Sequence, residues 1–206
     1  EKAQIKFNRI LIDLVAELSL LRAPVSQNKK LLKSAIGLRM QDAVYPFYPT
    51  FVTPMAAVAG AVADYMLSIL CENNKLRKAY VNNGGDIAIY LEDNEVFNIG
   101  IITDLKTRAI GGTTAITQID NINGIATSGR HGRSHSLGIA DAVTVLAKNS
   151  AQADAAATLI ANAVDLQDTT LVKKIPANEL SPDSDLADKL VTVDVAKLPN
   201  KLAEKA

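Results

Sequence analysis

The sequence is poor in features that mark secreted and nucleic-acid-binding proteins. Among its 206 residues Cys71 is the only cysteine, so no disulfide can form within the chain, as is typical of a reducing cytoplasm. Its 22 basic and 22 acidic side chains cancel, so the charge indicates no general attraction to nucleic acid or to an acidic membrane surface. We therefore expect a cytoplasmic protein with no nucleic-acid partner.

Long uninterrupted apolar runs are also missing. The most apolar segment, residues 55–71, contains Asp64 and falls short of the roughly 18 to 20 uninterrupted apolar residues that a membrane span needs. The first residues lack the basic start and short apolar run of a secretory leader. We expect no membrane partner. The hydrophobic content of 48% is enough to fill the core of one domain over residues 1–206.

Alanine-rich segments are predicted to form the main helices. Residues 55–70 follow Pro54, which suits a first helical turn, and residues 151–164 follow Ser150, which is placed to cap a helix. Near the N-terminus the apolar period favours a helix up to Leu21, although part of that segment, residues 7–14, could equally be a strand. The prolines between positions 45 and 54 predict an irregular connection.

Strand-like segments fill much of the remaining chain. Residues 86–91 alternate in polarity and are joined by a polar turn to residues 96–102, so we expect these two segments to pair as a hairpin. Further strands are predicted at residues 113–119, 124–128, 142–147 and 190–195. This mixed order predicts an α+β fold with a mainly antiparallel sheet packed with alanine-rich helices.

A diglycine turn is the first candidate ligand site. Asn83, Gly84, Gly85 and Asp86 lie between two strand-like runs. Glycines permit positive φ and let a ligand approach the backbone, so a phosphate or a flat ring could bind there. The turn could equally have been selected for its geometry alone.

A second glycine-flanked loop carries hydroxyl groups and is followed by cations. Thr127 and Ser128 precede Gly129, and the next residues include Arg130, His131, Arg133 and His135. Guanidinium and backbone N–H groups match phosphate oxygens, so a pyrophosphate is a reasonable ligand, with a solvated basic loop as the alternative. A catalytic triad of Ser128, His135 and Asp141 can also be drawn, but such residues often co-occur by chance.

Asp154 and Thr158 form a candidate metal site. They are four residues apart in the predicted second helix, so both oxygens project from the same face. A carboxylate and a hydroxyl suit Mg²⁺, which takes its remaining ligands from water and substrate phosphates. On spacing alone, an ordinary pair on a helix surface explains these residues equally well.

In chain order, these segments resemble the ApbE family of FAD:protein FMN transferases. The similar segments are residues 83–87, 124–129, His135, 142–147 and 153–158, together with the helix at 55–64. Residues 53–165 are most similar to the UPF0280 group of ApbE-like proteins. The resemblance implies a T-fold-like ApbE-like domain that binds FAD, with Asp154 and Thr158 as side-chain ligands of Mg²⁺.

The resemblance also implies roles for the glycine turns and for the histidine. Residues 83–86 would line the flavin cleft, residues 127–130 would contact the nucleotide, and His135 would lie near the reacting phosphates as a catalytic residue. In the family a threonine or serine of an acceptor protein attacks the phosphorus of the FMN half and releases AMP, with Mg²⁺ neutralising the pyrophosphate.

The chain departs from the family pattern at several positions. An Ile-Asp-Pro-Arg-Thr-Gly-like segment is missing after His135, Ala59 replaces a lysine, and no lipoprotein leader is visible. Two hypotheses therefore remain: a Mg²⁺-dependent enzyme that transfers FMN or cleaves FAD, and a flavin- or nucleotide-binding protein without turnover. Exposed strand edges would make a homodimer unsurprising.

Overall fold

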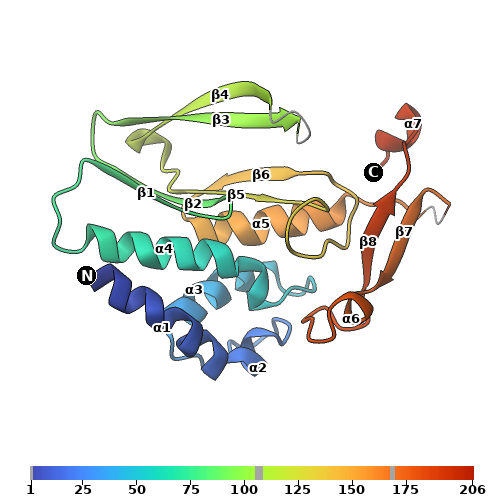
Figure 1. Cartoon of the computed structure of the whole chain (residues 1–206), viewed down its shortest axis with the longest axis horizontal. Helices are drawn as coiled ribbons and strands as arrows, with labels where there is room; N and C mark the ends of the chain where they lie inside the picture. The colour runs from blue at the N-terminus through green and yellow to red at the C-terminus, as the bar shows by residue number, and fades with distance from the viewer. Residues whose placement is uncertain (1, 105–108, 168–169) are drawn as a thin grey trace.

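The computed structural model describes residues 2–104, 109–167 and 170–206 and shows an α+β fold built in layers (Figure 1). The central sheet is antiparallel, with strand order β1-β2-β5-β6. Helices α4 and α5 pack on one face, and the β3–β4 hairpin covers the other. The elements of these layers are β1 (Lys78–Asn83), β2 (Asp86–Leu91), β3 (Val96–Asp104), β4 (Ala109–Thr117), β5 (Gly124–Ser128), β6 (Val143–Ala147), α4 (Val58–Cys71) and α5 (Ser150–Ala163). The predicted α+β class is therefore confirmed.

Strand alternation gives the sheet two different faces. Toward the helices it presents small side chains such as Ala88 and Ala126, both fully buried, so α4 and α5 can approach closely. Toward the hairpin it presents branched side chains such as Ile89 and Ile125, which pack against Ile116 of β4. Side chains aligned with Ala88 along β2, including that of Asp86, therefore belong to the helix side of the sheet.

Helix α4 is the most apolar element of the fold. Residues Pro54–Cys71, which include the short 3₁₀ segment η2 (Pro54–Ala57), are long and apolar enough to be a candidate membrane span, with a mean hydropathy of 1.6. Core helices pass the same test, and α4 packs between α5, the sheet and the N-terminal helices. Asp64 interrupts the apolar run, and its carboxylate accepts hydrogen bonds from backbone N–H groups at the start of α5.

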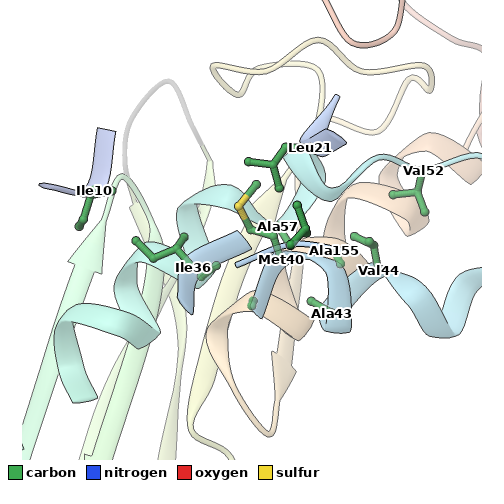
Figure 2. Packing of buried hydrophobic residues seen from close by; sticks show 12 residues of the cluster. Ile10, Leu21, Ile36, Met40, Ala43, Val44, Val52, Ala57 and Ala155 are labelled. Carbon is green, nitrogen blue, oxygen red and sulfur yellow. The ribbon is translucent and has the colours of Figure 1, made fainter. Parts of the chain in front are cut away.

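The N-terminal helices form the layer beyond α4 and α5. They are α1 (Lys2–Ala16), α2 (Leu18–Leu21) and α3 (Ala35–Val44), so the strand alternative for residues 7–14 is wrong. Figure 2 shows the main core cluster, in which Met40 and Val44 of α3 pack with Ala57 and Ala155. The irregular connection predicted around positions 45–54 is present and contains η1 (Tyr45–Phe47). Helix α3 was not predicted from the sequence.

A second antiparallel pair lies at one end of the central sheet (Figure 1). It consists of β7 (Val172–Pro176) and β8 (Leu190–Val195), with α6 (Ala177–Leu180) between them and α7 (Asn200–Ala203) after them. The pair is tied to the loop after β5, because Thr192 N–H donates to Ser136 O at 2.8 Å and Lys174 Nζ donates to Leu137 O at 2.7 Å.

The predicted pairing of residues 86–91 with 96–102 is wrong. Strand β2 pairs with β1 and β5, while β3 pairs with β4. The physical reason is that β2 has apolar side chains on both faces and lies inside the sheet, whereas Phe97 and Ile99 of β3 pack onto the face of that sheet. The turn at 92–95 therefore connects two layers instead of closing a hairpin.

The predicted cap of α5 is wrong by one residue. Asn149, with an extended backbone, accepts a hydrogen bond from Gln152 N–H at 2.8 Å, as an N-cap does. Ser150 is the first helical residue, and its side chain is buried. Both residues are good caps by type, so only the backbone conformation distinguishes them.

Candidate functional site

A cleft with a volume of about 590 Å³ lies where the start of α4 and one face of α5 meet the ends of β1 and β5 and the start of β2. It contains residues from each segment that the sequence analysis singled out. The predicted site residues that line the cleft are Asn83, Gly84, Asp86, Thr127, Ser128, His135, Asp154 and Thr158. Of the other predicted site residues, Gly85, Gly129 and Arg130 do not line it. Residues up to 75 positions apart in the sequence (158 − 83) thus converge on one cavity.

Asp154 joins the two alanine-rich helices. Its Oδ2 accepts a hydrogen bond from Gly60 N–H at 3.0 Å, and the carboxylate also interacts with the backbone N–H of Ala59. These N–H groups belong to the first turn of α4, whose N-cap residue Ala57 provides no side-chain acceptor. Asp154 therefore replaces the missing cap while lining the cleft.

Asp86 adds a second carboxylate to this wall of the cleft. Burial and, less strongly, the neighbouring charge of Asp86 raise the pKa of Asp154 to about 7, against the lowering effect of the Gly60 and Ala59 N–H groups. Burial likewise raises the pKa of Asp86 to about 6, although the Thr127 N–H lowers it. Oδ1 of Asp86 is buried without a hydrogen-bond partner in the described part of the chain. Two close carboxylates with one unsatisfied oxygen favour a bound proton or cation.

Hydroxyl groups continue the polar wall. Thr158 Oγ1 donates to Ser128 Oγ at 3.3 Å, which places the hydroxyl of α5 beside the end of β5. Thr127 Oγ1 instead lies 2.9 Å from Thr144 Oγ1, on the sheet face that Ile125 shares with the hairpin. The wall is therefore lined by oxygen ligands from two carboxylates and from the hydroxyls of Thr158 and Ser128.

The diglycine turn closes one side of the cleft. Gly84 and Gly85 have φ values of 72° and 114°, a region that favours glycine, so the turn geometry accounts for both residues. Gly85 N–H donates to Asn82 Oδ1 at 2.9 Å, and Asn83 Nδ2 donates to Ala59 O at 3.1 Å. The second bond fixes the turn against the start of α4.

In the loop after β5, Gly129 and Arg130 have structural partners. A Cβ on Gly129 would lie 2.5 Å from Asp141 O, so only glycine fits there. The guanidinium of Arg130 pairs with Asp141 Oδ1 at 2.7 Å, and His131 Nε2 lies 3.2 Å from the same oxygen. Ser128 and His135 do not form the hydrogen bond of a catalytic triad. Ser128 Oγ instead accepts from Thr158 Oγ1, and His135 Nε2 lies 3.0 Å from Ser181 Oγ.

Several cleft residues were not among the predicted site residues. Arg133 was noted only as one of the loop cations, and Asn162 lies one turn beyond Thr158 on α5. Asp185 comes from the C-terminal region and hydrogen-bonds with Thr53, which also lines the cleft. Spacing in the sequence could have indicated Asn162, but only tertiary structure brings residues 53 and 185 together.

The donor set meets part of the requirement for a divalent cation. Within residues 2–104, 109–167 and 170–206, no group of three or more His, Cys, Asp or Glu side chains could hold a metal ion. Asp154, Thr158 and the unsatisfied Asp86 oxygen are nevertheless hard ligands of the kind Mg²⁺ uses when substrate phosphates and water complete its shell. The residues fit a cation that depends on its ligand, but not a closed structural metal site.

The fold and the cleft together define an α+β protein with a polar cavity of the size that small-molecule ligands occupy. Comparison with protein families identifies the family. A family model described as "AbpE bacteria" matches residues 1–206, and the chain belongs to this ApbE-like family.

The curated proteins that the chain is similar to include several UPF0280 proteins. The chain is 42% identical over 113 residues to UPF0280 protein MJ1526 of Methanocaldococcus jannaschii, a match covering 54% of the chain and 45% of that protein. It is 40% identical over 112 residues to a UPF0280 protein of Methanococcus vannielii, with the same coverage. It is 38% identical over 115 residues to UPF0280 protein MK0206 of Methanopyrus kandleri, covering 55% and 44%. The predicted UPF0280 resemblance is confirmed. The chain spans less than half the length of these relatives.

Proposed function

We propose that the chain binds a flavin nucleotide, FAD, in the cleft between the diglycine turn and α5, on a T-fold-like ApbE-like scaffold. The observation that carries the proposal is the convergence of both glycine-flanked segments with Asp154 and Thr158 on one cavity of about 590 Å³. Cavities of roughly 300–1,000 Å³ are typical of small-molecule sites. Family membership supports a flavin as the ligand.

Each wall of the cleft supplies a different kind of contact to such a ligand. The turn at Gly84 exposes backbone without a side chain, so a flat ring can approach it closely. Ser128 offers a hydroxyl that can donate to ribityl or phosphate oxygens, and Thr127 lines the cleft beside it. Phe51 and Met55 add apolar surface on the side of the cleft formed by the segment before α4.

A second candidate function is Mg²⁺-dependent transfer of FMN or cleavage of FAD, favoured by the buried Asp86 oxygen that has no hydrogen-bond partner in the described residues and lines the same cleft as Asp154 and Thr158. Asp154 and Thr158 would hold Mg²⁺, which supplies charge neutralisation to phosphate oxygens when bound. In transfer, the hydroxyl oxygen of an acceptor protein forms a bond to the FMN phosphorus, the bond from that phosphorus to the AMP oxygen breaks, and the hydroxyl proton is released.

The chain's own residues would orient the ligand for this step. Asp154 is held by the first turn of α4, and Thr158 is held by Ser128, so both oxygens have fixed positions. His135 lines the same cleft and is tethered to Ser181, which would keep its ring near the phosphates. Fixed groups lower the cost of ordering the reacting atoms.

The test is a titration of FAD into the purified protein, with and without Mg²⁺, followed by thermal unfolding and by chromatographic detection of AMP. A rise in melting temperature with FAD supports binding. AMP release that requires Mg²⁺ and is lost in Asp154→Ala supports the enzyme. Asp93→Ala, which removes an exposed carboxylate in the 92–95 turn, is the matched control.

The outcomes separate the candidate functions. Stabilisation without AMP, with several acceptor proteins present, would leave a flavin-binding protein without turnover. If FAD, FMN and ATP all fail to raise the melting temperature with or without Mg²⁺, the proposed function is wrong.

A further inference from the structure

Arg133 lies against the diglycine turn at the edge of the cleft. It lines the cleft, and its Nη1 is 3.7 Å from the point that a Cβ on Gly84 would occupy. Gly84 and Arg133 are 49 positions apart in the sequence (133 − 84). They meet because the β1–β2 turn and the loop after β5 lie at the same end of the antiparallel strands. The missing side chain of Gly84 leaves the guanidinium facing bare backbone.

The other cations of this loop are engaged elsewhere. Arg130 and His131 both contact Asp141, and His135 contacts Ser181. Among the ion pairs found within residues 2–104, 109–167 and 170–206, none includes Arg133. Arg133 is thus a cleft-facing cation whose charge the described protein groups do not neutralise by an ion pair.

The rest of the cleft needs such a charge if it is to accept an anion. Asp86 and Asp154 present carboxylates whose charges repel phosphate, and their hydroxyl neighbours carry no compensating charge. A guanidinium is planar, stays protonated and presents several N–H donors, which match the oxygens of a phosphate in a bidentate arrangement.

We propose that Arg133 binds the phosphate or pyrophosphate of the flavin nucleotide, on the side of the cleft that Gly84 lines. This inference rests on the proposed function, because it names the side chain that binds the phosphate groups of the proposed flavin ligand. Arg133 would therefore decide between phosphorylated and unphosphorylated flavins. Gly84 contributes by its backbone conformation, since a side chain would be strained at φ of 72°.

The test compares riboflavin, FMN, FAD and ADP as ligands of the full chain in the presence of EDTA, so that no cation contributes. Flavin binding is followed by fluorescence and ADP binding by calorimetry. Arg133→Gln should weaken FMN, FAD and ADP binding roughly tenfold or more, because a charge-assisted bidentate contact is lost, and should leave riboflavin unchanged. Wild-type FAD affinity should fall with added salt more steeply than that of the variant.

Arg77→Gln is the matched control, because it removes the same charge from a side chain that is 79% exposed and paired with Glu95. Its affinities should equal those of the wild type. Arg133→Lys keeps the charge but loses the planar fork, and should give FAD an intermediate affinity. Melting temperatures of all variants show whether each is folded, and Arg133→Lys serves as the test if the glutamine variant is not.

Each result has a distinct meaning. Equal FAD affinity in wild type and Arg133→Gln would overturn the inference, as would an equal loss for riboflavin, which would place the guanidinium against the ring. If no flavin binds the wild type but ADP binds and depends on Arg133, the proposed flavin function fails while phosphate recognition by Arg133 stands. If neither flavins nor ADP bind, both fail.

Discussion

Asp64 and Asp154 cap each other's helices. Asp64, on α4, accepts hydrogen bonds from Ser150 and Ala151 N–H at the start of α5, both at 2.9 Å. Asp154, on α5, accepts one from Gly60 N–H at the start of α4. Each carboxylate satisfies backbone donors that have no partner within their own helix and lies at the positive end of its dipole. The two caps fix the crossing of the helices that carry one wall of the cleft.

The cap provided by Asp64 predicts a loss of stability when it is removed. Asp64→Ala leaves two buried N–H groups at the start of α5 without acceptors, so the free energy of unfolding should fall by about 2 kcal/mol or more. Asp64→Asn keeps one oxygen acceptor and should lose less. Urea denaturation at neutral pH measures both, with Asp93→Ala as an exposed control. A change in Asp64→Ala no larger than in the control would show that the cap is not stabilising.

The pair formed by Asp86 and Asp154 predicts that stability falls as the pH rises. Both carboxyls have pKa values raised from 3.8, to about 6 and about 7, so the folded chain binds their protons more tightly than the unfolded chain. Their contribution is fully present below 3.8 and is lost as the pH rises through these values. Without divalent cations, the melting temperature should therefore drop between roughly pH 4 and pH 7.

Asp154→Asn tests the origin of this pH dependence. The amide oxygen can still accept from Gly60 N–H, but the side chain no longer titrates and no longer repels Asp86. Its melting temperature should vary less with pH than that of the wild type and should be equal or higher at pH 8. Parallel curves for the two proteins, measured by calorimetry, would rule out this carboxyl pair as the cause.

Local sequence patterns were sufficient to predict most secondary structure near the cleft. The alternation in residues 86–91, the β-branched run at 143–147 and the alanine-rich periodicity of α4 and α5 each reflect which side chains face the core. Strand pairing was not predictable in the same way, because the neighbours of β2 depend on which side of the sheet β3 covers. That choice depends on contacts between distant apolar residues.

The residues of the candidate site were also only partly predictable from local sequence patterns. The glycine turns and the Asp154–Thr158 spacing indicated the residue types that line the cleft, and eight of those positions do so: 83, 84, 86, 127, 128, 135, 154 and 158. Arg130 and Arg133 could not be distinguished in the sequence, since both are loop arginines three residues apart. Only the position of Asp141 shows that the first is paired.

The crossing of α4 and α5 predicts a strict size limit at position 60. A Cβ on Gly60 would overlap the backbone carbonyl of Ser150 and would lie 2.8 Å from Ala151 Cα. Gly60→Ala should therefore lower the free energy of unfolding by about 2–3 kcal/mol, although alanine has the higher helix propensity. Gly112→Ala is the control, since no atom lies within 4 Å of its Cβ position. Equal denaturation midpoints for both variants would contradict the close crossing.

The hydroxyl of Thr158 predicts how the site responds to Mg²⁺. Thr158→Val keeps the shape of the side chain but removes the oxygen that faces Ser128 in the cleft. FAD alone should still raise the melting temperature, because the glycine turns and the loop after β5 are unchanged, whereas the Mg²⁺ concentration needed for half of the additional stabilisation should rise roughly tenfold or more.

The matched control for this prediction is Thr113→Val, which removes an exposed hydroxyl from β4. Both variants keep the same volume and both lose one hydroxyl, so a difference between them in thermal unfolding reports the position of the oxygen. If Thr158→Val responds to Mg²⁺ as the control does, the hydroxyl of Thr158 does not ligate the cation. The cation would then have to be held by the two carboxylates and the phosphates alone.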